Sequence, residues 1–326
     1  MPQTEWSYRG FWYMGAVVAM AAASCLGQTR DPDGPRVSLI SRAPRPTETG
    51  SSPNLRAGVK VVLIPVTVTD PYGAPYSGLK AKAFRLFENG IEQQVNYFSA
   101  VEAPISVGIV FDASRSMEDK IDDARAGVKQ FLQTAIEGDE FSLVAFNDVP
   151  RILSGFTTNP IEIERRLLGL TTVNWTALLD AVYMSVQQMK RARNPRKALL
   201  IVSDGGDNHS RYTESEMRAV VREADVCIYS IAFIGAGFMK SHARLLKKLS
   251  DETGGLTCEV QKLNELPDAV TAISSAIRTQ YLLGYVSTNT SNNGLYRKVE
   301  VRLNPPADSP RLRPAWRMGY YAPADF

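Results

Sequence analysis

Five oxygen-bearing side chains in three separated segments are candidates for binding one metal ion. Asp112, Ser114 and Ser116 stand at alternate positions in VFDASRSME, directly after the apolar run SVGIVF. Thr176 lies at the start of WTALLDA, and Asp204 follows a second apolar run, KALLIVS. Two carboxylates and three hydroxyls are hard oxygen ligands, which select Mg²⁺, Ca²⁺ or Mn²⁺ over Zn²⁺. The residue types therefore predict a site for one such cation.

Each of these residues also has an ordinary structural interpretation. Serines such as Ser114 and Ser116 commonly cap helices or form turns, and an aspartate at a strand end is common. Thr176 and Asp204, from two other segments, supply further oxygen ligands, and such a combination in three segments is less expected by chance. The combination therefore favours metal binding over capping alone.

The segments that carry these residues alternate between strand and helix patterns from Pro104 onward. SVGIVF and KALLIVS are continuous apolar runs, typical of parallel strands buried on both faces. Helical spacing follows over about 120–136, and Asn159-Pro160 is a helix start. The alternation predicts an α/β fold with a doubly wound, mainly parallel sheet over about 104–280. Asp112 and Asp204 would then stand at the carboxyl edge of the sheet, where such folds bind ligands.

Further elements of this domain are expected from shorter patterns. Strands are predicted at FSLVAF, RILSGF, VCIYSIAF and LTCEV, and helices at WTALLDAVYMSVQQM and ARLLKKLSDETGG. The start of WTALLDA would supply Thr176 in a loop that reaches the same rim as the two aspartates.

Both flanks of the α/β region have β patterns. Residues 59–103 contain a β-branched run, VKVVLIPVTVTD, and the hairpin signal Asn89-Gly90. Residues 281–326 contain the strand-like runs YLLGYVS, LYRKVEVRLN and WRMGYYA. A unit as small as residues 59–103 needs a partner to be stable. We therefore predict that the two flanks pack together as one small β domain into which the α/β domain is inserted.

The N-terminal segment predicts export. Arg9 precedes an apolar run over residues 11–23, which is short for a membrane span and fits a secretory signal. Residues 1–27 are predicted to be a signal peptide or a lipoprotein signal lipidated at Cys25, and an uncleaved membrane anchor stays open as a third interpretation. All three place the rest of the chain in the periplasm, the cell envelope or the extracellular space. Residues 28–58, rich in Pro, Ser, Gly and Thr, are predicted to be a disordered linker.

The charge of the chain argues against one class of partner, and its cysteines leave a disulfide open. The net charge of +3 over 326 residues, with no basic stripe, argues against nucleic acid as a partner. Cys227 and Cys258 both lie in apolar strand-like runs, so a disulfide and two buried thiols are left open.

The candidate ligands carry a family resemblance. The run D-A-S-R-S, the threonine of T-A-L-L-D-A and the aspartate of V-S-D-G resemble the metal-ion-dependent adhesion site of von Willebrand factor type A domains. The resemblance covers about 104–280, and it departs from the family at Asn174-Trp175, where relatives often carry glycine. It implies that one cation is held by Asp112, Ser114, Ser116, Thr176 and Asp204.

The flanks resemble a narrower group. VTVTDPYGAPYSGL, FRLFENGIEQQV, YLLGY and RMGYY are similar to the von Willebrand factor A-related proteins of acidobacteria, which are exported bacterial proteins. The resemblance of residues 104–280 to the adhesion site of type A domains implies more: direct metal contacts from Ser114, Ser116 and Thr176, with Asp112 and Asp204 often acting through water. It also implies a protein partner whose Glu or Asp carboxylate completes the metal shell, and a movable last helix near 266–277.

Two alternatives to this adhesion or assembly function stay open. One is a metal-dependent hydrolase or phosphatase with Asp112 as nucleophile, although the chain has only two histidines, His209 and His242, without ligand-like spacing. The other is a structural envelope scaffold. We favour a non-enzymatic binding protein; the sequence leaves the partner, the choice among Mg²⁺, Ca²⁺ and Mn²⁺, and the oligomeric state open.

Overall fold

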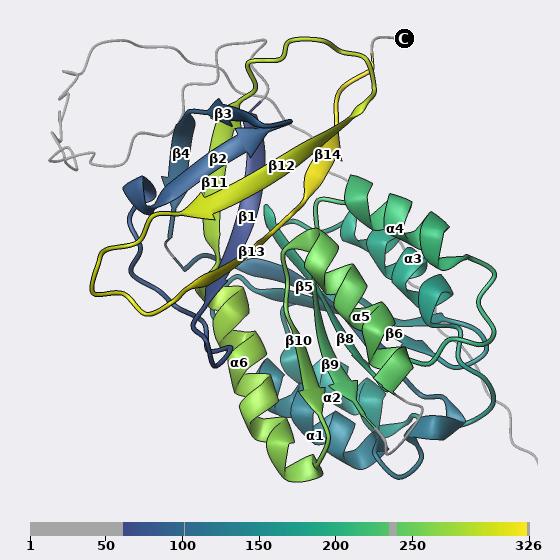
Figure 1. The fold of residues 1–326 in the computed structure, drawn as a ribbon. Helices are drawn as coiled ribbons and strands as arrows, with labels where there is room; N and C mark the ends of the chain where they lie inside the picture. Colours follow the sequence, from purple (N-terminus) through teal and green to yellow (C-terminus); the bar gives the residue numbers. More distant parts are fainter. Residues whose placement is uncertain (1–60, 101, 235–239, 325–326) are drawn as a thin grey trace, which may run out of the picture. The chain divides into compact units, whose positions relative to one another are not determined.

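The computed structural model describes residues 61–100, 102–234 and 240–324 (Figure 1). The predicted signal segment 1–27 and the predicted linker 28–58 lie outside the described residues. Within the described ranges, no helix is long and apolar enough to cross a membrane.

A six-stranded sheet forms the centre of the α/β region, in the order β10-β9-β8-β5-β6-β7. Neighbouring strands run parallel except at β7, which pairs antiparallel with β6 at one edge. This arrangement confirms the predicted α/β fold with a mainly parallel sheet. The strands are β5 (Ile105–Asp112), β6 (Glu140–Phe146), β7 (Arg151–Thr157), β8 (Arg196–Ser203), β9 (Cys227–Phe233) and β10 (Thr257–Val260).

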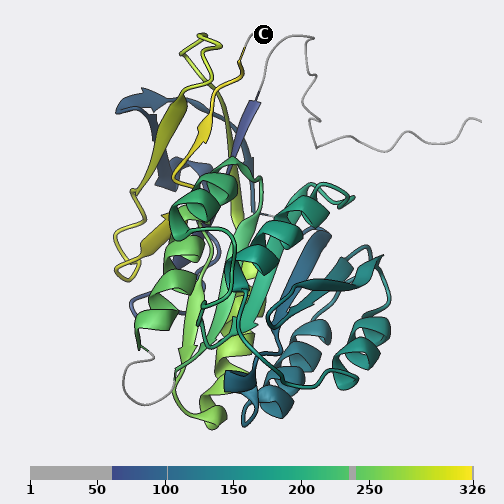
Figure 2. The same ribbon diagram turned by 90° about the vertical axis from the view of Figure 1, so that its right-hand side faces the viewer.

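Helices cover both faces of this sheet (Figures 1 and 2). Alternate residues of β5 point to opposite faces, so Ile109 and Phe111 belong to one apolar core and Val110 belongs to the other. The first core also holds residues of α1 (Ile121–Leu132), α2 (Pro160–Leu168) and α6 (Leu266–Arg278). The second holds residues of α3 (Leu178–Met189), α4 (Glu214–Glu223) and α5 (Lys240–Thr253).

Two helices differ from the sequence-based expectation. Helix α3 begins at Leu178, so Trp175 and Thr176 lie in the preceding loop rather than in the first turn. Helix α4 is not among the predicted elements, because only Met217 and Val221 are buried along it. Its start nevertheless carries a capping box between Thr213 and Glu216, a sequence signal of a helix N-terminus.

Strands from the two ends of the chain form two antiparallel four-stranded sheets, in the orders β13-β1-β11-β4 and β14-β12-β2-β3. The N-terminal β1 (Val61–Thr69) pairs with the C-terminal β11 (Tyr281–Val286) and β13 (Arg313–Trp316). The two sheets share one apolar core, so the flanks form the small β domain that the sequence predicts. The remaining strands are β2 (Phe84–Glu88), β3 (Ile91–Gln93), β4 (Val95–Ser99), β12 (Tyr296–Leu303) and β14 (Gly319–Tyr321).

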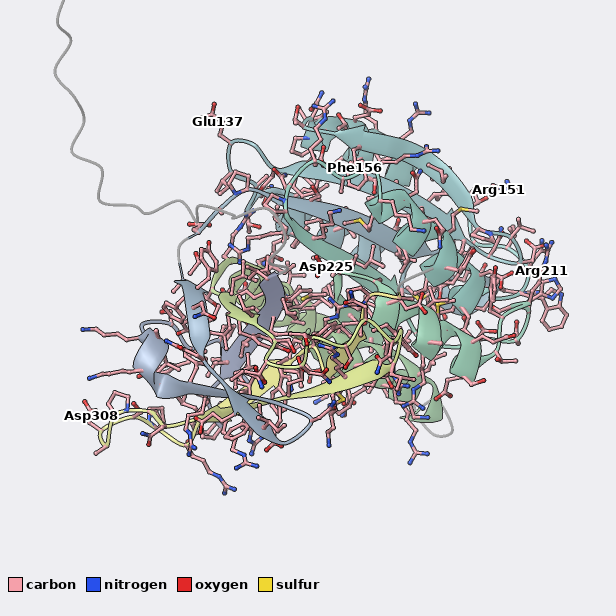
Figure 3. All side chains as sticks on the ribbon, turned by 90° about the horizontal axis from the view of Figure 1, so that it is seen from above. Glu137, Arg151, Phe156, Arg211, Asp225 and Asp308 are labelled. Atoms are coloured by element: carbon pink, nitrogen blue, oxygen red, sulfur yellow. The ribbon has the colours of Figure 1, made fainter. Side chains whose placement is uncertain are left out.

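Specific contacts join the β domain to the α/β region. The Thr67 hydroxyl donates to the carbonyl of Gly254 at 3.0 Å, and Arg317 Nη1 lies 3.2 Å from Asp225 Oδ1. Charged side chains such as Arg151, Arg211 and Asp308 project from different parts of the surface (Figure 3). The described residues belong to one compact unit, although the β core and the two α/β cores share no residue.

Candidate metal centre

The first predicted segment forms a tight turn at the carboxyl end of β5. Asp112 ends the strand and is fully buried, and its Oδ1 accepts a hydrogen bond from the Ser114 backbone N–H at 2.9 Å. The hydroxyls of Ser114, which is buried, and Ser116, which is exposed, lie 3.1 Å apart. Ser114 stands at the N-cap of the short 3₁₀ turn Arg115–Met117 without a side-chain cap bond, and Lys120 is the N-cap of α1. Neither serine side chain makes a cap hydrogen bond at these two helix starts, whereas Ser114 does begin a turn, because its carbonyl accepts from the Met117 N–H at 3.1 Å.

The second segment lies beside the first because β5 and β8 are neighbours. The hydroxyl of Ser203, the last residue of β8, donates to Asp112 Oδ2 at 2.5 Å and accepts from the Gly205 N–H at 2.9 Å. Asp204 follows, is 1% exposed, and accepts the Gly206 N–H on Oδ1 at 3.2 Å. Gly205 has φ +79°, a conformation that favours glycine and allows this sharp turn. Ser203 was missed in the sequence analysis, although it stands directly before a predicted ligand.

The loop that carries Thr176 is hydrogen-bonded to both of the other segments. On one side, Val173 N–H donates to the Ala113 carbonyl at 3.1 Å. On the other, Thr176 N–H donates to Asn208 Oδ1 at 2.9 Å, and its carbonyl accepts from the N–H groups of Asn208 and His209. Asn208 is not among the predicted ligands, and its side-chain oxygen holds the backbone of Thr176 in place. All three predicted segments thus meet at one rim of the sheet.

The unusual residue pair before Thr176 has a physical explanation. Asn174 has φ +59°, the left-handed conformation that glycine adopts most easily and that asparagine also tolerates. Its carbonyl accepts the Arg115 N–H at 3.4 Å, and its amide donates to Asp148 Oδ2 at 3.3 Å. The departure from the glycine of relatives therefore retains a glycine-like backbone here.

The rim carries two buried carboxylates whose negative charge is only partly compensated. Burial raises the pKa of Asp112 to about 6, hydrogen bonds from Ser114 and Ser203 oppose this shift, and the neighbouring carboxylate of Asp204 adds to it. Asp204 Oδ2 is buried and accepts no hydrogen bond. Its closest ion-pair partner is the Lys120 ammonium, 3.7 Å away. A buried carboxylate oxygen without a hydrogen bond is energetically unfavourable, and a hard cation would compensate it.

The donor set fits a hard cation and not a soft one. Two carboxylates and three hydroxyls suit Mg²⁺, Ca²⁺ or Mn²⁺. Across the part of the chain that the structure describes, no group of three or more His, Cys, Asp or Glu side chains is placed to hold a metal ion. The oxygen donors of the rim are nevertheless of the types that an oxygen-ligated divalent cation requires.

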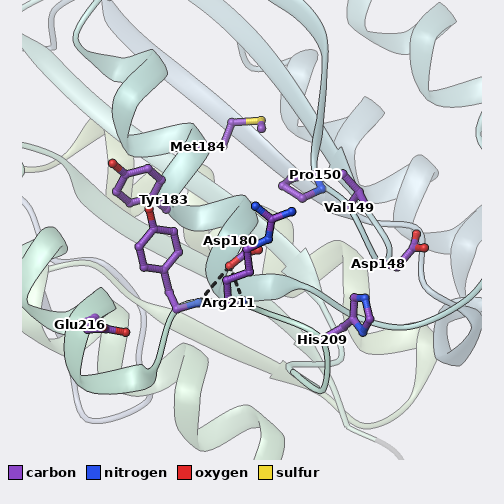
Figure 4. A pocket seen from close by; sticks show the side chains of 10 residues that line it. Asp148, Val149, Pro150, Asp180, Tyr183, Met184, His209, Arg211 and Glu216 are labelled. Atoms are coloured by element: carbon purple, nitrogen blue, oxygen red, sulfur yellow. Dashed lines mark hydrogen bonds between the residues drawn. The ribbon is translucent and has the colours of Figure 1, made fainter.

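A hollow of about 830 Å³ adjoins the rim on the side of Thr176. Figure 4 shows Asp180 within it, where the carboxylate accepts hydrogen bonds from the N–H groups of Arg211 and Tyr212. Tyr183 and Tyr212 stack on one wall with ring centroids 4.4 Å apart, and His209 lies on another. The surface beside the candidate centre is therefore hollowed and mixed in polarity.

The two cysteines of the sheet are free thiols. Cys227 begins β9, and Cys258 lies beside Ile231, four residues further along that strand. Burial raises the pKa of Cys227 to about 12 and that of Cys258 to about 11. The structure thus selects free thiols from the two interpretations left open by the sequence.

Comparison with known proteins identifies the α/β region. Residues 107–206 match the family model described as von Willebrand factor type A domain. Inter-alpha-trypsin inhibitor heavy chain H4 of Bos taurus is 25% identical over 213 residues, which cover 59% of this chain and 23% of that protein. The Homo sapiens protein of the same name is 23% identical over 223 residues, covering 61% and 24%. The chain therefore spans about a quarter of the length of these curated relatives.

Solved structures of low sequence identity also match. A von Willebrand factor type A protein from Catenulispora acidiphila is 11% identical with a TM-score of 0.49, covering 82% of this chain and 75% of that one. The vWF domain of the type V pili tip protein Mfa5 from Porphyromonas gingivalis is 17% identical with a TM-score of 0.44, covering 55% and 96%.

The protein contains a von Willebrand factor type A domain, as the predicted motif implied. The narrower resemblance of its flanks to acidobacterial proteins stays a prediction.

Proposed function

We propose that this protein is an exported binding module that captures an acidic residue of a partner protein through one divalent cation at the rim of its type A domain. Domains of this class are commonly protein-interaction modules. The role would be adhesion, assembly or ligand capture at the cell envelope. Export is proposed from the N-terminal sequence, as a cleaved signal, a lipoprotein signal or an anchor.

The buried carboxylate of Asp204 is the main support for this proposal. Asp204 Oδ2 is buried without a hydrogen-bond partner, at a rim that also contains the buried carboxylate of Asp112 and the hydroxyl of Ser114. Native proteins rarely leave a buried carboxylate oxygen unsatisfied unless it binds something. Mg²⁺ is the cation we favour, with Ca²⁺ and Mn²⁺ as alternatives.

The five predicted ligands would have two different roles. Ser114, Ser116 and Thr176 would hold the cation by neutral oxygens, while Asp112 and Asp204 supply negative charge around it. Asp112 is fixed in place by Ser203 and by the backbone of its own turn. A cation with mostly neutral direct ligands remains electrophilic and accepts a carboxylate from another molecule.

The surface around the rim supports a macromolecular partner. Trp175, next to Thr176, is 61% exposed, and Val149 and Val173 are also exposed. Large aromatic side chains are the residues that most often dominate binding energy in protein interfaces. An acidic residue at the metal and apolar contacts to Trp175 would together define the bound segment.

The enzyme alternative is weaker in this geometry. A nucleophilic Asp112 would need an accessible oxygen, whereas both of its oxygens accept hydrogen bonds and the residue is fully buried. His209 is exposed and lies near Thr176 through a backbone contact, without a hydrogen bond from its ring to Asp112. We therefore favour binding over catalysis.

The test is a pull-down from a bacterial envelope extract with the full chain immobilised, in Mg²⁺ and in EDTA. The proposal expects a partner that is retained in Mg²⁺, released by EDTA and lost with Asp112→Ala. Trp175→Ala is expected to weaken retention while leaving Mg²⁺ binding by calorimetry unchanged. Retention that survives both EDTA and Asp112→Ala would indicate the scaffold alternative instead.

Asp122→Ala is the matched control. It removes a carboxylate from the same region of the chain, but that side chain is 89% exposed and pairs with Arg125 rather than with the rim. This variant should retain the partner as the wild type does. A metal-dependent turnover in a phosphatase or hydrolase screen would favour the enzyme alternative.

A further inference from the structure

Lys120 places a positive charge at the candidate metal centre. Its Nζ lies 3.7 Å from Asp204 Oδ2 and donates to the Ser116 carbonyl at 3.2 Å. Its backbone is fixed, because its N–H donates to the Met117 carbonyl and its carbonyl accepts from Ala124. The lysine therefore belongs to the same short segment as three of the predicted ligands, and its side chain reaches a fourth, Asp204.

We propose that Lys120 is a tethered cation that compensates Asp204 when no metal is bound, and that it thereby sets the metal affinity of the rim. The inference rests on the proposed metal site. It adds a specific residue that opposes binding, rather than another ligand.

The charges at the rim support this role. Two buried carboxylates, Asp112 and Asp204, lie close enough for their charges to interact. Lys120 provides the ion pair of Asp204 found among the described residues. The pair is long for a charge-assisted hydrogen bond, so the ammonium compensates the charge without satisfying Oδ2 as a hydrogen-bond acceptor. The folded protein can therefore tolerate Asp204 without metal, and Asp204 remains available to a cation of higher charge.

The lysine and a divalent cation cannot share this place without repulsion. Like charges a few ångströms apart repel strongly when solvent is partly excluded. The Lys120 side chain is 21% exposed, so a path to solvent exists, and its four-carbon stem can rotate without moving the backbone. Metal binding would then include the release of Lys120 from Asp204 toward water.

Two opposite effects follow from removing this charge. Without the lysine charge, the rim loses its internal competitor, and the affinity for Mg²⁺ is expected to rise by about tenfold. Without metal, the same change leaves Asp204 buried with no compensating cation, so the metal-free protein is expected to melt at a lower temperature. A merely structural salt bridge would give the second effect without the first.

The experiment compares Lys120→Met with the wild type in the full chain. MgCl₂ is titrated by isothermal calorimetry, and melting is followed in EDTA and in saturating Mg²⁺. Lys129→Met is the matched control, because it removes the same charge from the same helix, where Lys129 is 60% exposed and pairs with Glu164 at 3.8 Å. Lys129→Met should match the wild type in Mg²⁺ affinity.

The expected result is tighter Mg²⁺ binding by Lys120→Met, with a lower melting temperature in EDTA that recovers in Mg²⁺. Unchanged or weaker binding by this variant, in a wild type that binds Mg²⁺, would overturn the inference and leave the proposed function intact. Binding by neither protein would overturn both. Lys120→Arg retains the charge and should bind no more tightly than the wild type; tighter binding by it would also contradict the inference, even if Lys120→Met did not fold.

Discussion

Two buried carboxylates, Glu88 of the β domain and Asp204 of the type A domain, differ in their hydrogen-bond partners. Glu88 is 2% exposed and is surrounded by donors: Tyr285 and Tyr320 bond one oxygen at 2.7 Å each, and Ser287 bonds the other at 2.7 Å. Arg297, also buried, lies 3.5 Å away. Asp204 is equally buried, yet its Oδ2 has no hydrogen-bond partner and a single ammonium at 3.7 Å.

This difference is the one expected between a carboxylate that holds strands together and one that belongs to the proposed metal site. Glu88 stands on an N-terminal strand and its donors on C-terminal strands, so its network joins the two ends of the chain. A buried polar group with all its partners stabilises one arrangement of the strands. Asp204 instead retains an acceptor without a hydrogen bond at the carboxyl edge of the parallel sheet, where folds of this class bind ligands.

The largest expected effect is on the satisfied carboxylate. Glu88→Ala removes the shared acceptor of Tyr285 and Tyr320 and leaves Arg297 buried without its ion pair. Breaking such a pair from one side lowers the free energy of unfolding by about 3 kcal/mol or more. Denaturant unfolding measures the loss. A variant as stable as the wild type would show that the two carboxylates do not differ in this way.

The unsatisfied carboxylate should behave in the opposite manner. Asp204→Asn removes the charge and keeps the shape, so in EDTA the free energy of unfolding should change by less than about 1 kcal/mol. The stabilisation that Mg²⁺ gives to the wild type should disappear, because bound ligand stabilises the folded state by mass action. Melting in EDTA and in Mg²⁺ provides both values. Equal Mg²⁺ stabilisation of the variant and the wild type would count against Asp204 as part of the site.

The two regions can also be separated physically. A fragment of residues 104–280 retains both cores of the type A domain, which share no residue with the β core. It should fold and bind Mg²⁺, with a loss of about 1–2 kcal/mol from contacts such as Thr67 to Gly254. Circular dichroism during unfolding and calorimetry check this. A fragment that does not fold would argue against the inserted-domain interpretation.

The smallest effect is expected at the start of β9, at the end of the same sheet that lies opposite the candidate site. Cys227 begins β9 and is buried, and burial raises the pKa of its thiol to about 12, so little thiolate forms at pH 8. Cys227 should resist maleimide in the native protein and react after denaturation, as peptide mapping can show. A disulfide-linked peptide of Cys227 and Cys258 would contradict the free-thiol structure.

Prediction from sequence succeeded where a pattern was long or where residue types were specific. Continuous apolar runs identified β5 and β8, and the flanking strands paired as expected because neither flank has a core of its own. Helix α4 was missed because only Met217 and Val221 are buried along it, which is too few for a clear periodic pattern.

The candidate site shows the same limit at the level of side chains. The predicted ligand segments meet at one rim because parallel strands end at a common edge. Ser203 and Asn208 position that rim through single bonds between distant segments, and no spacing in the sequence reports such bonds. The ion pair of Lys120 with Asp204 likewise emerges only in three dimensions.

Binding of one divalent cation at the rim can be measured by calorimetric titration of MgCl₂ into the full chain, with Asp112→Ala as the comparison. We expect one Mg²⁺ per wild-type chain and no measurable binding to the variant. Absence of binding to the wild type, or equal binding to both proteins, would contradict the proposed metal site.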